Sequence, residues 1–150
     1  MSSDHIYQLY IRAEIEDVWR ALTDPEATRQ YFHATHWISP PAVGEAFQTH
    51  LPDGSIAVDG VVEVVEPPRR LVHTWHPVYD DDLAAEPPSR VSWELTPAGD
   101  GLTHLRLTHG ALEQSPLTSE NVRNGWVWIL DSLKTLLETG SPLPPPSLMP

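Results

Sequence analysis

The stretch SENVRNGWVWILDSLKTLLET, residues 119–139, has the spacing of one long amphipathic helix. At about 100° per residue, its apolar side chains fall within an arc of roughly 120°. The charged residues Asp131, Lys134 and Glu138 lie outside that arc. We therefore expect one face of this helix to be buried. The apolar stripe consists of Val122, Trp126, Ile129, Leu130, Leu133, Leu136 and Leu137.

Most of the chain before this helix alternates like short β-strands. Residues 6–12, IYQLYIR, place Tyr7, Leu9 and Ile11 on one side, with period two. Strand spacing returns after residue 35, in segments separated by proline- and glycine-rich turns. Short strands in series favour an antiparallel meander, and one face of such a sheet could cover the apolar stripe. The predicted segments are 37–38, 45–51, 56–66, 71–76, 91–96 and 102–108.

Two short helices are predicted between the first strand and the meander. Ile15, Val18, Trp19 and Leu22 have helical spacing. The sequence Asp24-Pro25-Glu26 then supplies an N-cap, a proline at the first helical position and an early acid for a second helix. The expected order is thus one strand, two short helices, several strands and a long helix.

Composition and charge bound the classes of function. A chain of 150 residues that is 40% hydrophobic is expected to form one domain, residues 1–140, followed by a proline-rich tail, 141–150, with nothing to pack against. The formal charge of −12 disfavours nucleic acid and anionic membranes as partners. There is no cysteine, no secretory leader pattern and no long apolar run. We expect a soluble cytoplasmic protein.

Aromatic residues are the leading candidates for a binding site. By strand alternation, His73 and Trp75 share one face with Leu71, and Trp93 lies between Val91 and Leu95 on the next strand. These faces are expected to meet Trp126, where the rings either line a pocket or fill the core. The predicted cavity residues are Tyr31, Phe32, Phe47, Val61, His73, Trp75, Trp93, His109, Trp126, Ile129, Leu130 and Leu133.

Polar chemistry is harder to find in the sequence. His73 is either a buried neutral histidine or the polar group that orients a ligand. His33 and His36 lack the partner spacing of a metal site, and the aspartate run 80–82 lacks the spacing of a calcium loop and is expected to be a solvated turn. No GxSxG, GxxxxGK[ST] or GxGxxG motif is present. We predict no catalytic residue, metal or cofactor.

The order of elements resembles the helix-grip fold of the START-like, or SRPBCC, superfamily. Within it, the chain is similar to the family related to the C-terminal domain of the heat-shock-protein ATPase activator. Three blocks carry the resemblance: VWRALTDPEATRQYF at 18–32, VDGVVEVVEPPRRLVHTW at 58–75 and GWVWILDSLKTLLETG at 125–140. The resemblance implies an α+β domain in which a curved antiparallel sheet wraps around the C-terminal helix. It also implies a cavity between helix and sheet, but no particular chemistry.

Three functions follow as hypotheses. The first is a protein that binds an apolar or aromatic small molecule in this cavity. The second, implied by the family, is a cochaperone-like module that contacts a chaperone in a stress response, as a monomer or a homodimer. Against it, the chain has one lysine, Lys134, so a basic docking surface would depend on its eight arginines. The third is a cyclase or hydrolase, which would need Tyr31, His73 or His109 to meet across the pocket.

Overall fold

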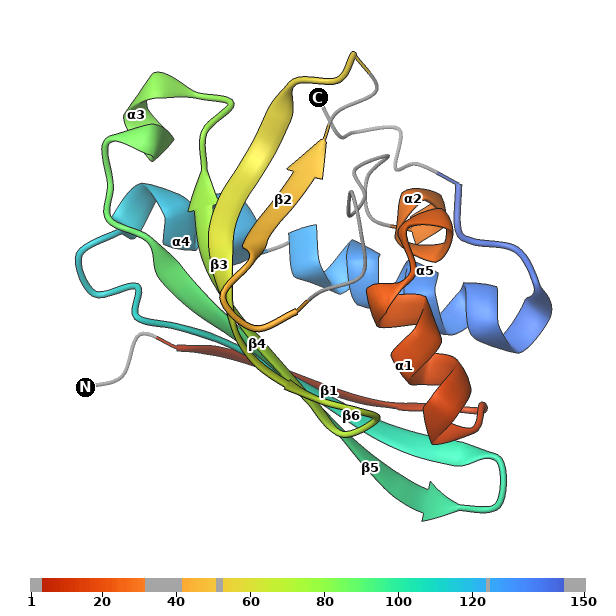
Figure 1. Cartoon of the computed structure of the whole chain (residues 1–150). Coiled ribbons are helices and arrows are strands. Elements are labelled where there is room, and N and C mark those ends of the chain that lie inside the picture. Colours follow the sequence, from red (N-terminus) through yellow and green to blue (C-terminus); the bar gives the residue numbers. More distant parts are fainter. Residues whose placement is uncertain (1–3, 32–41, 51–52, 124, 145–150) are drawn as a thin grey trace.

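The computed structural model describes residues 4–31, 42–50, 53–123 and 125–144. Its centre is a six-stranded antiparallel sheet in the order β1-β6-β5-β4-β3-β2. Figure 1 shows this sheet curving beside α5, with α1 and α2 next to that helix. The predicted helix-grip fold is confirmed. The strands are β1 His5–Ile11, β2 Ala46–His50, β3 Ile56–Glu66, β4 Arg70–Pro77, β5 Ser89–Gly99 and β6 Leu102–Gly110.

The two short helices after β1 form where predicted. They are α1, Ile15–Thr23, and α2, Pro25–Tyr31. Asp24 caps α2, because its carboxylate oxygen Oδ1 accepts the Glu26 N–H at 3.0 Å. Both helices contact α5, so they close one end of the space between α5 and the sheet.

The C-terminal helical region consists of α4, Pro116–Arg123, and α5, Gly125–Thr139. The sequence predicted one helix over 119–139, whereas the helical region begins three residues earlier, at Pro116. Asn124, between the two helices, is outside the described residues. The predicted stripe is confirmed for five of its seven residues, and Leu136 and Leu137 are half-buried. Val122 of α4 is buried, as are Trp126, Ile129, Leu130 and Leu133 of α5.

The loop after β4 contains a short helix that the sequence analysis missed. In α3, Asp81–Ala84, the Asp80 carboxylate accepts the N–H groups of Asp82 at 2.9 Å and Leu83 at 3.2 Å. The aspartate run is solvent-exposed, as predicted, but it forms a helix N-terminus, where carboxylates are favourable, rather than a turn. The strand predicted at residues 37–38 lies outside the described residues.

The first part of the tail packs on α5. Gly140, with φ +91°, ends the helix, and the chain then turns back. The Leu143 N–H donates to Ser132 Oγ at 3.2 Å, and the Trp128 indole N–H donates to the Pro144 carbonyl at 3.2 Å. The prediction of a tail with nothing to pack against is thus wrong for residues 141–144. Residues 145–150 are outside the described residues.

No helix within the described ranges has the length and apolar content to cross a bilayer. The longest of the described helices, α5, has 15 residues, whereas a membrane-spanning helix needs about 20 apolar residues.

Candidate functional site

Six rings from five elements pack together between the sheet and α5, and we call them the ring cluster. Trp126 of α5 meets Trp75 of β4 with ring centroids 5.1 Å apart and Trp93 of β5 at 5.5 Å, as the strand alternation predicted. Each of the six side chains is at least 94% buried. The cluster consists of Phe47, His73, Trp75, Trp93, His109 and Trp126.

His109 lies in a chain of hydrogen bonds that fixes its tautomer. Its Nδ1 accepts the Trp126 indole N–H at 2.9 Å, and its Nε2 lies 2.6 Å from Ser89 Oγ. Because Nδ1 accepts, a neutral ring must carry its proton on Nε2 and donate it to Ser89. The Ser89 hydroxyl in turn donates to the Trp75 carbonyl at 3.3 Å. Every polar group in this chain has a partner.

His73 uses the opposite tautomer. Its Nε2 accepts the Trp93 indole N–H at 3.1 Å, so the proton is on Nδ1, which donates to the Thr74 carbonyl at 3.0 Å. The Phe47 ring stacks on this imidazole, with centroids 3.8 Å apart and planes 12° from parallel. His73 therefore presents one ring face to Phe47 while both of its nitrogens are engaged.

Both imidazoles are held neutral. Burial lowers the pKa of His73 from 6.5 to about 4 and, with a further contribution from His73, that of His109 from 6.5 to about 3. Protonating either ring would also place an N–H against the indole N–H that it now accepts. At neutral pH the ring cluster is therefore an uncharged surface.

Tyr31 does not join the histidines as a reacting group. Its hydroxyl donates to the Ala21 carbonyl of α1 at 2.7 Å, and burial raises its pKa. The three residues that an enzyme hypothesis would need are thus each committed to structural hydrogen bonds.

The other predicted cavity residues have mixed outcomes. Ile129, Leu130 and Leu133 are buried on α5, whereas Phe32 lies outside the described residues. The prediction for Val61 is wrong, because its side chain is 48% exposed. Val61 precedes Val62, which is 1% exposed and pairs with His73, so alternation turns Val61 to the outer face.

Two inward polar residues were not predicted. Ser89 shares the buried face of β5 with Val91 and Trp93, and Thr49 shares the buried face of β2 with Phe47. Strand alternation could have found both, since each lies two residues from a predicted inward residue.

A separate cleft of about 420 Å³ lies between α1, α2 and the end of α5. Ala21, Ala27, Leu136 and Leu137 supply its apolar lining, with Arg12 among its polar residues. None of the ring cluster lines it. Across the part of the chain that the structure describes, no group of three or more histidine, aspartate or glutamate side chains could hold a metal ion.

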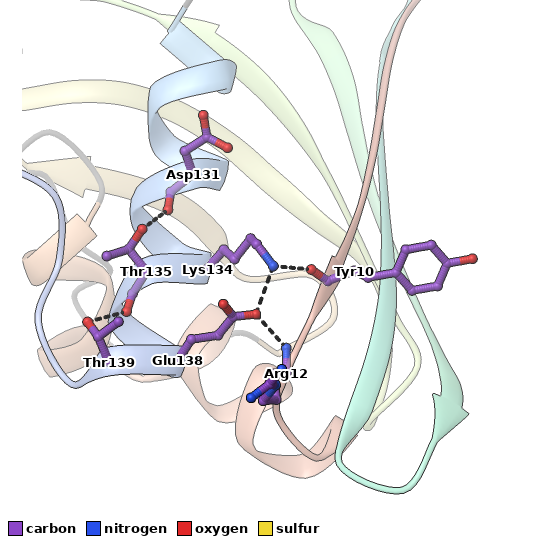
Figure 2. Close-up of polar contacts among 7 residues, drawn as sticks. All are labelled: Tyr10, Arg12, Asp131, Lys134, Thr135, Glu138 and Thr139. Carbon is purple, nitrogen blue, oxygen red and sulfur yellow. Dashed lines mark hydrogen bonds and ion pairs between the residues drawn. The ribbon is translucent and has the colours of Figure 1, made fainter.

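Next to this cleft, side chains of α5 bind the end of β1 (Figure 2). Lys134 Nζ donates to the Tyr10 carbonyl at 2.7 Å and to Glu138 Oε2 at 2.8 Å, and the Arg12 backbone N–H donates to the same oxygen at 2.7 Å. These bonds lower the pKa of Glu138. Because β1 is an edge strand, they pair backbone groups that an edge would leave open.

The model of the family described as "Activator of Hsp90 ATPase homolog 1-like protein" matches residues 12–138. The chain belongs to this family. The match begins directly after β1 and runs to the last turn of α5, so it includes the whole ring cluster. It confirms the family resemblance of the three sequence blocks. A search of the curated proteins found no match.

Solved structures of similar sequence share the fold of this family member. DynU16, from the dynemicin biosynthetic locus, is 27% identical with a TM-score of 0.77; the match covers 95% of this chain but 49% of DynU16, so the chain spans about half its length. Protein MLL2253 from Mesorhizobium loti is 29% identical, with a TM-score of 0.75, and the match covers 90% of this chain and 96% of MLL2253. CalU16 from Micromonospora echinospora is 29% identical, with a TM-score of 0.71, and the match covers 94% of this chain and 77% of CalU16.

Proposed function

We propose that this protein binds an uncharged, apolar or aromatic small molecule between the sheet and α5, against the ring cluster. The observation that carries the proposal is that buried indole and imidazole rings are fixed in orientation by hydrogen bonds and held neutral. Flat apolar faces of this kind stack on aromatic ligands. Affinity would come from buried apolar area, at about 25 cal/mol per Å².

The hydrogen bonds of the cluster favour binding over catalysis. A general base needs a nitrogen that is free to take a proton from a substrate. Each nitrogen of His73 and His109 already donates or accepts. Using either histidine as a base would break a buried bond to tryptophan, so shape and ring stacking are the chemistry that this site offers.

The comparisons support a small-molecule role as well. DynU16 belongs to a biosynthetic locus and is 27% identical to this chain, so a related domain occurs where small molecules are made. The cochaperone hypothesis has less support from the surface. Arg20, Arg29, Arg90 and Arg123 already form ion pairs with neighbouring carboxylates, which reduces the positive charge available for docking.

Entry of a ligand requires side chains to move. Phe47 is 2% exposed and Trp75 is 6% exposed, so a ligand that stacks on these rings must displace the atoms that cover them. We therefore expect binding to be coupled to a local opening of the cluster and to be slower than diffusion.

The test is a titration followed by the indole N–H signals in ¹H–¹⁵N spectra, assigned with single Trp→Phe variants. Naphthalene and the two-ring phenol naphthol serve as probes. We expect saturable shifts of the Trp75, Trp93 and Trp126 signals. Trp128 bonds to the tail instead and is the internal control. Shifts confined to Trp128, or no saturable shift with either probe, would overturn the proposal.

A further inference from the structure

Thr49 carries a buried hydroxyl that no hydrogen bond among the described residues uses. The residue lies on β2 and is 2% exposed. Its Oγ1 has no hydrogen-bond partner among the described residues. Leaving a buried hydroxyl unpaired destabilises a folded protein relative to pairing it. A group that carries this cost in a folded protein requires a reason.

The other buried hydroxyls of the described residues make the contrast clear. Each of them donates to or accepts from a group that the fold supplies. Thr103, for example, donates to the Ala13 carbonyl at 2.8 Å, and Ser115 donates to the Pro87 carbonyl at 2.8 Å. Thr49 is the exception among the buried serine and threonine hydroxyls, which otherwise belong to Thr28, Ser89, Thr103, Ser115, Thr118 and Ser132.

The position of Thr49 relates this hydroxyl to the ring cluster. Thr49 and Phe47 are two residues apart on the same buried face of β2, which corresponds to roughly 7 Å along the strand. Phe47 in turn stacks on His73. The residue that carries this hydroxyl is therefore two strand positions from the nearest ring of the cluster.

We infer that the Thr49 hydroxyl is the polar anchor of the ligand, and that the ligand is an uncharged aromatic molecule bearing a ring hydroxyl or a carbonyl. This inference rests on the proposed function. A threonine hydroxyl can donate to a carbonyl or accept from a phenol, so it suits both groups. A carboxylate or an amine is disfavoured, because no charged partner balances it in the ring cluster and an unpaired buried charge is costly.

The experiment compares Thr49→Val and Thr49→Ser in the full chain, with naphthol and naphthalene as probes and calorimetry as the readout. Valine keeps the shape of threonine and removes the hydroxyl, whereas serine keeps the hydroxyl. We expect Thr49→Val to weaken naphthol binding about 3- to 10-fold, the effect of one hydrogen bond. Naphthalene binding should not change, and Thr49→Ser should retain the preference for naphthol.

The outcomes separate this inference from the function on which it rests. If both probes bind and Thr49→Val affects neither, or both equally, the anchor is overturned and the proposed function stands. If neither probe binds to the unmutated protein, both are overturned.

A second measurement needs no ligand. Thr49→Val should raise the melting temperature, because it removes an unpaired hydroxyl from the interior. The matched control is Thr103→Val, which breaks the bond to Ala13 and should lower it. An equal loss of melting temperature in the two variants would show that the Thr49 hydroxyl is paired within the fold, and would overturn the inference.

Discussion

His73 and His109 should make the protein lose stability as the pH falls from 7 to 5. Both side chains have a folded-state pKa well below their ordinary value of 6.5, about 4 and about 3. Above pH 6.5 both side chains are mostly neutral in the folded and in the unfolded chain, so they contribute little to the pH dependence of the free energy of unfolding. Between pH 6.5 and about 4, the unfolded chain takes up protons that the folded chain refuses, and unfolding is favoured.

The expected magnitude follows from these values. Each pH unit below 6.5 costs about 1.4 kcal/mol per histidine until the folded-state pKa is reached. From pH 7 to 5, each histidine should therefore remove about 2 kcal/mol, and the pair about 4 kcal/mol. This is a large part of the free energy of unfolding of a typical domain, which is roughly 5–15 kcal/mol. Carboxylates with a lowered pKa, such as Glu86, act in the same direction, but only near and below their ordinary value of 4.5.

Urea unfolding at pH 7 and pH 5 measures this loss. In His109→Gln, the amide can replace the ring as donor and acceptor but does not titrate, so the loss should fall to about half. His104→Gln, on the opposite face of β6, is the matched control and should keep the loss of the unmutated protein. His5, whose pKa is also lowered, is present in all three proteins. An undiminished loss in His109→Gln would refute the reasoning.

Three further substitutions should change stability in defined ways, each measured by urea unfolding. Gly60→Ala would place its Cβ against the Thr74 carbonyl oxygen of β4, so it should destabilise the fold by about 1–3 kcal/mol; an unchanged midpoint would contradict the close approach. Trp126→Phe leaves a buried imidazole nitrogen without its donor and should cost about 3–5 kcal/mol, combining lost packing and the orphaned acceptor, whereas Trp128→Phe, near the surface, should cost less than half as much. Glu138→Gln removes an ion pair on the half-buried edge and should cost at most about 1 kcal/mol at pH 7. Because the pKa of Glu138 is lowered, that contribution should be lost as the pH falls below 4.5. A stability difference between Glu138→Gln and the unmutated protein that is the same at pH 7 and below pH 4.5 would contradict this.

The periodicity of the sequence predicted which residues share a face. Alternation placed Trp75 and Trp93 inward, helical spacing placed Trp126 opposite them, and the structure confirms their contact. Such predictions succeed because strand and helix periods are set by the backbone alone. They fail where the backbone departs from its period or where a segment is too short to show one, as in the four-residue helix α3.

Hydrogen-bond partners could not be predicted in the same way. That His73 accepts from Trp93, and His109 from Trp126, depends on strand register and on the rotamers of four side chains. The sequence analysis left His73 as either a satisfied core histidine or a ligand group. The structure supports the first of these, since both nitrogens are paired inside the fold.

The pairing of histidine with tryptophan also explains how this interior can contain polar rings. A core of leucine and valine would avoid the cost of burying four imidazole nitrogens, and catalysis would require at least one of those nitrogens to be available. In each pair, the indole N–H donates to one imidazole nitrogen. The other imidazole nitrogen bonds to the Thr74 carbonyl in His73 and to the Ser89 hydroxyl in His109. The pairs therefore fix ring orientation and exclude charge, and under the proposed function these properties would select the shape of a bound molecule. Recognition of its polar group is then left to a residue outside the pairs, and Thr49, on the same buried face as Phe47, is the described residue with a hydroxyl to supply.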